Sequence, residues 1–299
     1  MTIQALEFYS GIGAFAQAAR RLDVSVLSAF DQSQWANLTY QCNYGHKPNS
    51  RNLDSISAAD IPAGDLWWMS PPCTPFSRRG KQKDLEDNRA RSFLHLIGLL
   101  QSESMQGKRP RYILIENVEG FIGSKMHDHL LDTLAKNGYQ TAEFRLCSSM
   151  FGVPMLRPRV FIVAGLTAFN ADAVPPPVPT RESINKYLHV ADETFNCDPE
   201  MLKRYDAVLN IVDPAVADSY FICFTSGYHR CRQASGSLIS TGPGAARFVA
   251  PQEILALLGF DSQYSIPETI PLEVAYKLVG NSVDVRAITF LLREVLGLK

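Results

Sequence analysis

Short apolar runs alternate with amphipathic stretches through the first half of the chain. The runs have the length of buried strands, whereas the stretches between them repeat their apolar positions at helical spacing. Strands that alternate with helices in this way predict an α/β fold with a parallel sheet covered on both faces. The expected strands lie at residues 3–9, 24–31, 65–70, 111–118, 140–147 and 159–166, and the expected helices lie at 13–22, 33–45, 127–138 and from 92 onward.

The pattern changes after about residue 168. The segment 173–180 (AVPPPVPT) is too rich in proline for a central strand or a helix and predicts a linker. Periodicity stays weak to about residue 247, and a helical pattern with proline in its first turn returns at 251–260. We therefore predict a large domain from residues 1–168 and 248–299 and a small unit at 169–247.

Composition and charge narrow the function classes only slightly. The formal net charge is −1, so nucleic acid is neither favoured nor excluded, and it would have to meet a local basic patch. The first residues lack the pattern of a signal peptide, and the apolar runs are too short to span a bilayer. We expect a cytoplasmic protein without a membrane partner, or a nuclear one in a eukaryote.

The cysteine spacing and the helical patterns lead to two further expectations, about metal binding and about self-association. The six cysteines show neither CxxC nor zinc spacing, which predicts free thiols and no metal site. No long exposed apolar helix is evident for self-association, so we expect a monomer.

A glycine turn follows the first expected strand at residues 8–15 (FYSGIGAF). Gly-x-Gly between a strand and a helix allows a tight turn, a close ligand approach and free helix N–H groups. Asp31 ends the second strand twenty residues after Gly11, where dinucleotide-binding folds use a carboxylate for ribose hydroxyls. Asp31 could instead, or also, cap the next helix. Together these features predict an adenosine-type cofactor.

Cys73 stands between prolines in SPPCTPF, directly after the third expected strand. Ligands of open α/β sheets bind at the carboxyl ends of strands, and the basic residues Arg78, Arg79 and Lys81 that follow would favour a thiolate. The sequence predicts a held nucleophile, with an inert cysteine in a rigid loop and a solvated basic run as the alternatives.

Two further polar groups lie at strand ends. Glu116 and Asn117 end the apolar strand 111–118, where a buried carboxylate needs a partner or a use. Arg157 and Arg159 begin the last strand two residues apart and would share one face. A helix cap for Glu116 and surface ion pairs for the arginines are the alternatives.

These motifs, in this order and followed by GNSV at 280–283, resemble those of the cytosine-C5 methyltransferases over nearly the whole chain outside roughly 170–245. The resemblance implies a Rossmann-like sheet that binds S-adenosyl-L-methionine, with 169–247 as a small target-recognition domain. It implies that Cys73 is the nucleophile, Glu116 the acid, and Arg157 and Arg159 the pair that orients the base. The cofactor residues that it implies are Tyr9, Ser10, Gly11, Ile12, Gly13, Asp31, Gln32, Asn52, Ser70, Pro72, Asn281, Ser282 and Val283.

The chemistry of cytosine explains these residue types. Its C5 is too weak a nucleophile to take a methyl group, but addition of a thiolate at C6 turns C5 into an enamine carbon that can. Glu116 at N3 would stabilise the charge that develops as Cys73 adds.

Other residues resemble the subgroup that methylates cytosine 38 in the anticodon loop of tRNA(Asp). They are the Cys-Phe-Thr of residues 223–225 and the Asp-x-Arg of 87–89, although Thr74 stands where the subgroup commonly has glutamine. A cytosine in a loop is already partly unstacked, which eases its capture. The substrate residues that we predict are Arg78, Arg79, Lys81, Arg89, Cys223 and Thr225. For Cys223, a buried structural thiol is the alternative.

Two other functions stay open at this point. One is a DNA cytosine-C5 methyltransferase of a restriction-modification system, whose members usually carry a longer recognition region. The other is a catalytically silent nucleic-acid-binding relative, against which the presence of both Cys73 and Glu116 argues.

Overall fold

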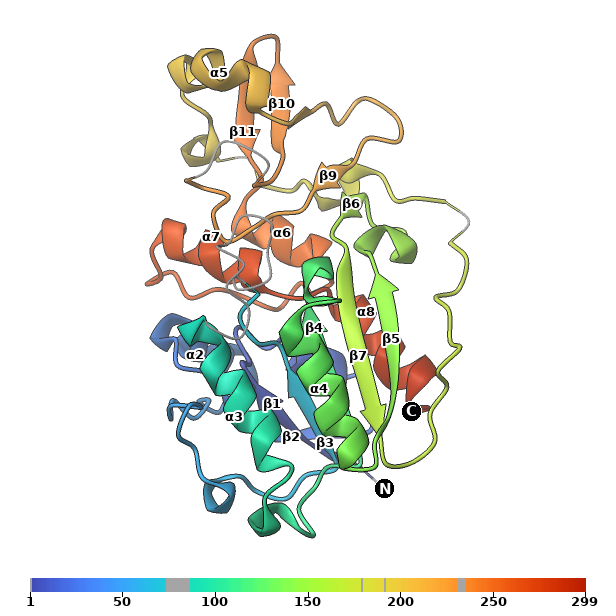
Figure 1. Cartoon of the computed structure of the whole chain (residues 1–299). Helices are drawn as coiled ribbons and strands as arrows, with labels where there is room; N and C mark the ends of the chain where they lie inside the picture. The colour runs from blue at the N-terminus through green and yellow to red at the C-terminus, as the bar shows by residue number, and fades with distance from the viewer. Residues whose placement is uncertain (1, 74–86, 179, 191, 231–234) are drawn as a thin grey trace.

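A six-stranded sheet forms the centre of the large part of the molecule, and a smaller unit with α5, β10 and β11 stands above it (Figure 1). The structure is a computed structural model that describes residues 2–73, 87–178, 180–190, 192–230 and 235–299. The strand order of the sheet is β2-β1-β3-β4-β7-β5. The strands are β1 (Ile3–Phe8), β2 (Val24–Phe30), β3 (Leu66–Met69), β4 (Tyr112–Asn117), β5 (Gln140–Leu146) and β7 (Arg159–Gly165).

The sheet is parallel on one side and antiparallel on the other. Strands β1 to β4 pair in parallel, whereas β7 runs antiparallel to both β4 and β5. The expectation of a parallel sheet is therefore wrong at this side. A parallel neighbour needs a long crossover, usually a helix, and no α-helix lies between β5 and β7.

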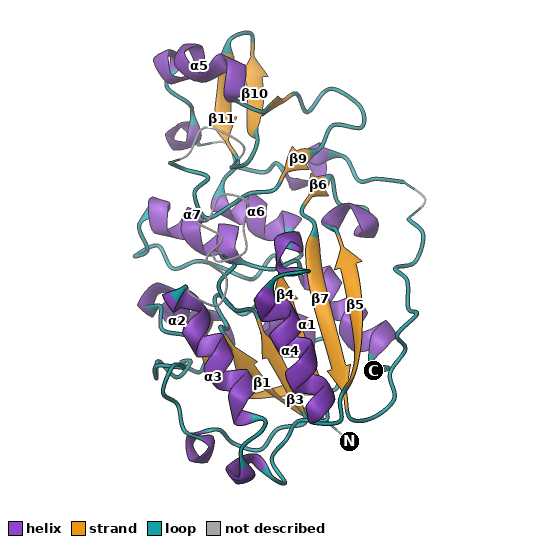
Figure 2. Ribbon diagram, viewed as in Figure 1, coloured by secondary structure: helices purple, strands orange, loops and turns teal. Residues whose placement is uncertain are grey.

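The two faces of the sheet bury different sets of side chains, as the alternation of strands requires. On one face Trp67 and Ile113 pack with α3 (Arg91–Leu99) and α4 (Lys125–Lys136), which Figure 2 shows in front of the sheet. On the other face Trp68 and Leu114 share a cluster with α1 (Ala14–Ala19) and α8 (Val285–Phe290). The chain therefore covers both faces with helices, as the sequence predicts.

The smaller unit contains short elements. Strands β8, β10 and β11 form a three-stranded sheet, and β6 pairs in parallel with β9. Residues 173–178 of the predicted linker form neither helix nor strand. The bounds are β6 (Met155–Leu156), β8 (Ile211–Val212), β9 (Phe221–Ile222), β10 (Leu238–Gly242), β11 (Ala245–Phe248) and α5 (Pro199–Tyr205).

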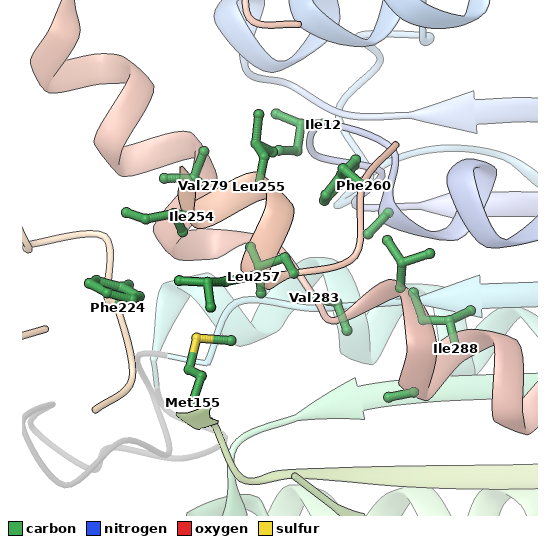
Figure 3. Packing of buried hydrophobic residues seen from close by; sticks show 14 of the residues in the cluster. Ile12, Met155, Phe224, Ile254, Leu255, Leu257, Phe260, Val279, Val283 and Ile288 are labelled. Atoms are coloured by element: carbon green, nitrogen blue, oxygen red, sulfur yellow. The ribbon is translucent and has the colours of Figure 1, made fainter. Parts of the chain in front are cut away.

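The last helices join the two parts. Their apolar side chains share one buried cluster with Met155, Phe224 and Ile12, which lie on segments far apart in the sequence (Figure 3). In the first turn of the first of these helices, Glu253 is fully buried and accepts hydrogen bonds from Arg247 and from the backbone N–H of Ala250. The bounds are α6 (Pro251–Leu257) and α7 (Leu272–Asn281), with α2 (Gln34–Tyr44) in the first half. Within the described residues, no helix is long and apolar enough to cross a membrane.

Candidate active site

The carboxyl ends of β1, β3 and β4 bring the predicted motifs to one edge of the sheet. The glycine turn follows β1, Cys73 comes four residues after β3 ends, and Glu116 and Asn117 end β4. The amide of Asn117 donates a hydrogen bond to the carbonyl of Pro71 at 3.3 Å. This bond fixes the proline loop to the strand that carries Glu116.

Glu116 forms a buried ion pair with Arg159. Nε of Arg159 lies 3.1 Å from Oε1 of Glu116, and the two side chains are 17% and 10% exposed. The pair forms because β4 and β7 are adjacent in the sheet. Burial raises the pKa of the Glu116 carboxyl, against the opposing effect of Arg159 and Arg157. This carboxyl can therefore hold a proton more readily than an exposed glutamate.

Cys73 shares this electrostatic environment. Burial, and then the charge of Glu116, raises the pKa of the Cys73 thiol, while Arg159 and Arg157 act in the opposite direction. The basic residues that the sequence predicts to favour a thiolate at Cys73 lie outside the described part of the chain. Arg78, Arg79 and Lys81 lie there, as does Thr74.

Arg157 binds the protein itself rather than facing open space. Its Nη1 donates to the carbonyl of Phe224 at 2.7 Å, and its Nη2 donates to the carbonyls of Gly280, at 3.1 Å, and Ser282. Only 3% of the residue is exposed. Both Arg157 and Arg159 approach Sγ of Cys223, whereas only Arg159 forms an ion pair with Glu116.

Cys223 is the second thiol of the site. Its Sγ lies 3.1 Å from Nη1 of Arg157 and 3.9 Å from Nη2 of Arg159. Burial opposes ionisation, but the two arginines outweigh it and lower the pKa of the Cys223 thiol. The alternative of an inert structural thiol is therefore disfavoured by these charges.

The segment after Cys223 packs against the GNS motif. A Cβ at Gly280 would lie 2.3 Å from the carbonyl carbon of Thr225 and 2.5 Å from the nitrogen of Ser226. Gly280 belongs to the GNSV motif but is not among the site residues that the sequence predicts. The backbone at 225–226 thus lies directly against Gly280, the residue that precedes the predicted cofactor residues 281–283.

The glycine turn has the left-handed backbone that its residues suggest. Residues Gly11 and Gly13 have φ of 54° and 85°, and Tyr9 adopts φ 56° without being a glycine. The N–H of Gly11 donates to Asp31 at 2.8 Å, and the second oxygen of that carboxylate accepts from the N–H of Ser33. Because the side chain of Ser33 caps α2, Asp31 supports the turn and is not the cap.

The surroundings of the turn fit S-adenosylmethionine, the cofactor that the resemblance implies. Ser10 and Ser282 are buried, and their hydroxyls have no hydrogen-bond partner among the described residues. Such groups are normally paired, so these two can serve a polar ligand. Gln32 and Asn52 hydrogen-bond to each other at 3.0 Å beside Asp31. The other predicted cofactor residues are Ile12 and Val283, which are buried, Ser70, which donates to the carbonyl of Tyr9, and Pro72 and Asn281, which are exposed.

Arg89 is placed beside a carboxylate. Its guanidinium donates to both oxygens of Asp87, at 2.8 and 2.6 Å, where the chain enters α3. About half of the Arg89 side chain is exposed, and its hydrogen bond to Asp87, with a smaller effect of Cys73, raises the pKa of the guanidinium. It therefore borders the site while remaining accessible from solvent. The structure adds no metal centre, because no cluster of His, Cys, Asp and Glu among the described residues could hold an ion.

Comparison with known proteins shows which family and which solved structures the whole chain resembles. Residues 3–297 match the family described as C-5 cytosine-specific DNA methylase. The chain is 30% identical to a DNA (cytosine-5)-methyltransferase of Dictyostelium discoideum, over an alignment that spans 99% of this chain and 94% of that protein. It is also 30% identical to the tRNA (cytosine(38)-C(5))-methyltransferase of Spodoptera frugiperda, over 98% of this chain and 99% of that protein. The solved structure of the Entamoeba histolytica methyltransferase EhMeth has a TM-score of 0.88 at 27% identity and covers 98% of each chain.

Proposed function

The chain belongs to the C-5 cytosine-specific DNA methylase family, and we propose that it acts on RNA, at cytosine 38 in the anticodon loop of tRNA(Asp). The family methylates C5 of cytosine and uses S-adenosylmethionine as the methyl donor. The open question is therefore the nucleic acid. The remaining parts of the proposal are a monomeric, cytoplasmic protein, with residues 169–247 as its target-recognition domain.

Cys73, Glu116 and Arg159 carry the reaction in this proposal. The Cys73 thiolate adds to C6 of the target cytosine and forms a C–S bond, while protonated Glu116 donates a hydrogen bond to N3. Arg159, held by Glu116 at 3.1 Å, donates to the O2 carbonyl of the base. S-adenosylmethionine supplies the methyl group that C5 then receives. A water molecule removes the proton from C5, and the electron pair of that bond expels Cys73 and restores the ring.

The surroundings of Cys223 are the observation that favours tRNA. The residues that resemble the tRNA-methylating subgroup, at 223–225, approach the catalytic Arg159 through Cys223, at 3.9 Å, and the GNS motif through Gly280. In this proposal they affect which nucleic acid can present its cytosine to Cys73. The similar proteins include both a DNA and a tRNA methyltransferase at 30% identity, so overall identity does not favour either substrate.

DNA methylation is the alternative function, and a silent binding protein is the second. The silent relative is disfavoured by the buried Glu116–Arg159 pair, because a buried carboxylate without chemical use is costly to keep. DNA is favoured over RNA by the description of the family as a C-5 cytosine-specific DNA methylase and by the name of the relative from Dictyostelium discoideum.

A methyl-transfer assay with matched substrates tests the proposal. The protein is incubated with radiolabelled S-adenosylmethionine and with a tRNA(Asp) transcript, the same transcript with uridine at position 38, or duplex DNA. We expect label in the first transcript only, and none with the Cys73→Ala variant. Label in DNA but not in tRNA would overturn the proposal in favour of the DNA enzyme. Absence of label from every substrate, with cofactor still bound, would favour the silent relative.

A further inference from the structure

Three side-chain hydroxyls donate hydrogen bonds to backbone carbonyls of the glycine turn at residues 9–13. The carbonyl of Tyr9 accepts a hydrogen bond from Ser70 at 3.1 Å, that of Ile12 from Tyr264 at 2.5 Å, and that of Gly13 from Tyr44 at 2.7 Å. The donors come from the end of β3, the segment after α6, and the last residue of α2. Three separate segments thus fix the carbonyl groups of one short turn.

The rings of Tyr44 and Tyr264 lie near each other, beside the glycine turn whose carbonyls they bind. Their ring centroids are 6.2 Å apart, and Tyr264 also contacts Phe260 at 4.4 Å. Burial raises the pKa of both hydroxyls well above the physiological range, so each remains protonated and able to donate. The side chain of Ile12 is buried in the same cluster as Phe260 and Leu255, as Figure 3 shows.

Gly13 leaves no free space on this side of the turn. A Cβ at this position would lie 2.3 Å from Cε2 of Tyr44 and 3.0 Å from the ring of Tyr40. The rings therefore limit movement of the turn toward α2, while the two hydroxyls hold its carbonyl groups. The backbone also needs such support because Tyr9 is held at φ 56°, a conformation unfavourable for a residue with a side chain.

We propose that Tyr44 and Tyr264 are positioning residues for the cofactor, whose hydroxyls keep the turn at 9–13 in the conformation that binds S-adenosylmethionine. Their hydroxyls hold the carbonyls of Ile12 and Gly13, and the buried hydroxyl of Ser10 between Tyr9 and Gly11, which has no hydrogen-bond partner among the described residues, is available to a ligand. A site that is already in its binding conformation does not lose affinity to the cost of ordering.

Tyr264 links the two halves of the cofactor site. It lies 252 residues from Ile12 in the sequence, and its segment leads into α7, which ends at Asn281 beside the buried hydroxyl of Ser282. The position of the turn therefore depends on the C-terminal part of the chain. This inference concerns the cofactor and does not depend on whether the substrate is RNA or DNA.

Phenylalanine variants test the role of the hydroxyls. Tyr44→Phe, Tyr264→Phe and the double variant are compared with Tyr139→Phe. Tyr139 is a matched control, because it is buried and its hydroxyl donates to the carbonyl of Pro110 at 2.7 Å, close to the opposite end of β4. Each protein is measured by calorimetry for the Kd of S-adenosylmethionine without nucleic acid, and by thermal unfolding.

We expect each of the two variants to raise the Kd about fivefold, the ratio that corresponds to one hydrogen bond, and the double variant to raise it further. The KM for the cofactor should rise in parallel, whereas kcat at saturating cofactor stays unchanged. Tyr139→Phe should lower the Tm and leave the Kd as it is. Wild-type Kd values in Tyr44→Phe and Tyr264→Phe, or an equal loss in Tyr139→Phe, would overturn the inference and leave these tyrosines a purely structural role.

Discussion

Arg159 and Glu116 form one buried ion pair, with Nε 3.1 Å from Oε1, across neighbouring antiparallel strands. The arginine keeps its charge under all conditions, whereas burial raises the pKa of the carboxyl. The pair can therefore present a fixed donor to one atom of a base and a proton to another. This division of roles distinguishes it from an ion pair that only stabilises the fold.

Replacement of Glu116 by glutamine should remove the proton donor and keep the shape. We expect kcat to fall by about 10²–10⁴-fold, the range found when general acids are removed, while the Kd of S-adenosylmethionine stays at the wild-type value. Glu119→Gln, an exposed carboxylate on the following turn, is the matched control and should retain full activity. Full activity in Glu116→Gln would show that this carboxyl has no part in catalysis.

The rate of adduct formation should increase with pH. Because burial and Glu116 raise the pKa of Cys73, most of the free protein holds a neutral thiol at pH 7, and the thiolate fraction rises as the pH increases through the alkaline range. Single-turnover methyl transfer measured from pH 6.5 to 9.5 should therefore accelerate up to the alkaline limit of stability. A rate that is constant over this range would mean that another step, or a thiolate formed only in the complex, controls turnover.

Gly280→Ala should destabilise the protein. The new methyl group would meet the carbonyl of Thr225 at 2.4 Å, and backbone would have to move, which costs about 1–3 kcal/mol for overpacked sites. Gly98→Ala in α3 is the control, because a Cβ there meets nothing within 4 Å and should stabilise the helix by about 0.8–1 kcal/mol. Urea unfolding of both variants checks the difference. Equal stability of the two would contradict the contact between 280 and 225.

Glu7 should make stability fall as the pH rises. The residue is fully buried in β1 beside Tyr40, whose hydroxyl donates to it at 3.0 Å, and burial raises its pKa to about 8. Between its unfolded pKa of about 4.3 and this value, only the folded state keeps the proton, so the free energy of unfolding drops by up to about 1.4 kcal/mol per pH unit. The nearby charge of Asp31 raises the pKa further.

Glu7→Gln removes this titration and keeps a carbonyl oxygen for Tyr40. We expect the variant to gain stability over the wild type progressively from pH 5 to pH 8 in chemical unfolding, with Glu103→Gln, an exposed carboxylate, as the control. Parallel profiles for wild type and Glu7→Gln would mean that the carboxyl is already ionised in the folded protein.

The sequence predicts which edge of the sheet carries the catalytic residues, but it does not predict the direction of every strand in the sheet. Cys73 and Glu116 could be assigned to one edge because the carboxyl ends of parallel strands coincide. The direction of β7 could not be predicted, since an apolar run has the same pattern in either direction. Arg157 and Arg159, two residues apart, both reach Sγ of Cys223, but the hydrogen bonds of Arg157 to the carbonyls of Gly280 and Ser282 depend on the assembled fold.

The contacts that support the glycine turn of the cofactor site could not be predicted from the sequence. Tyr264 stands in no motif, and its bond to Ile12 depends on folding over 252 residues. The hydrogen bond of Asn117 to Pro71 is similar, because it needs the strand order of the sheet before the two residues meet. Motifs at strand ends could be recognised locally, whereas their supporting contacts are properties of the assembled fold.

The contacts of Arg157 have a consequence for the order in which the site forms during synthesis. Its guanidinium binds carbonyls of Phe224, Gly280 and Ser282, so its acceptors are complete only when the last twenty residues of the chain are available. A nascent chain that lacks residues 280–282 holds Cys73, Glu116 and Arg159 but leaves the buried Arg157 without two of its acceptors. Catalytic competence thus requires residues 280–282, and a product truncated before residue 280 should be inactive even though it carries every residue assigned to the chemistry.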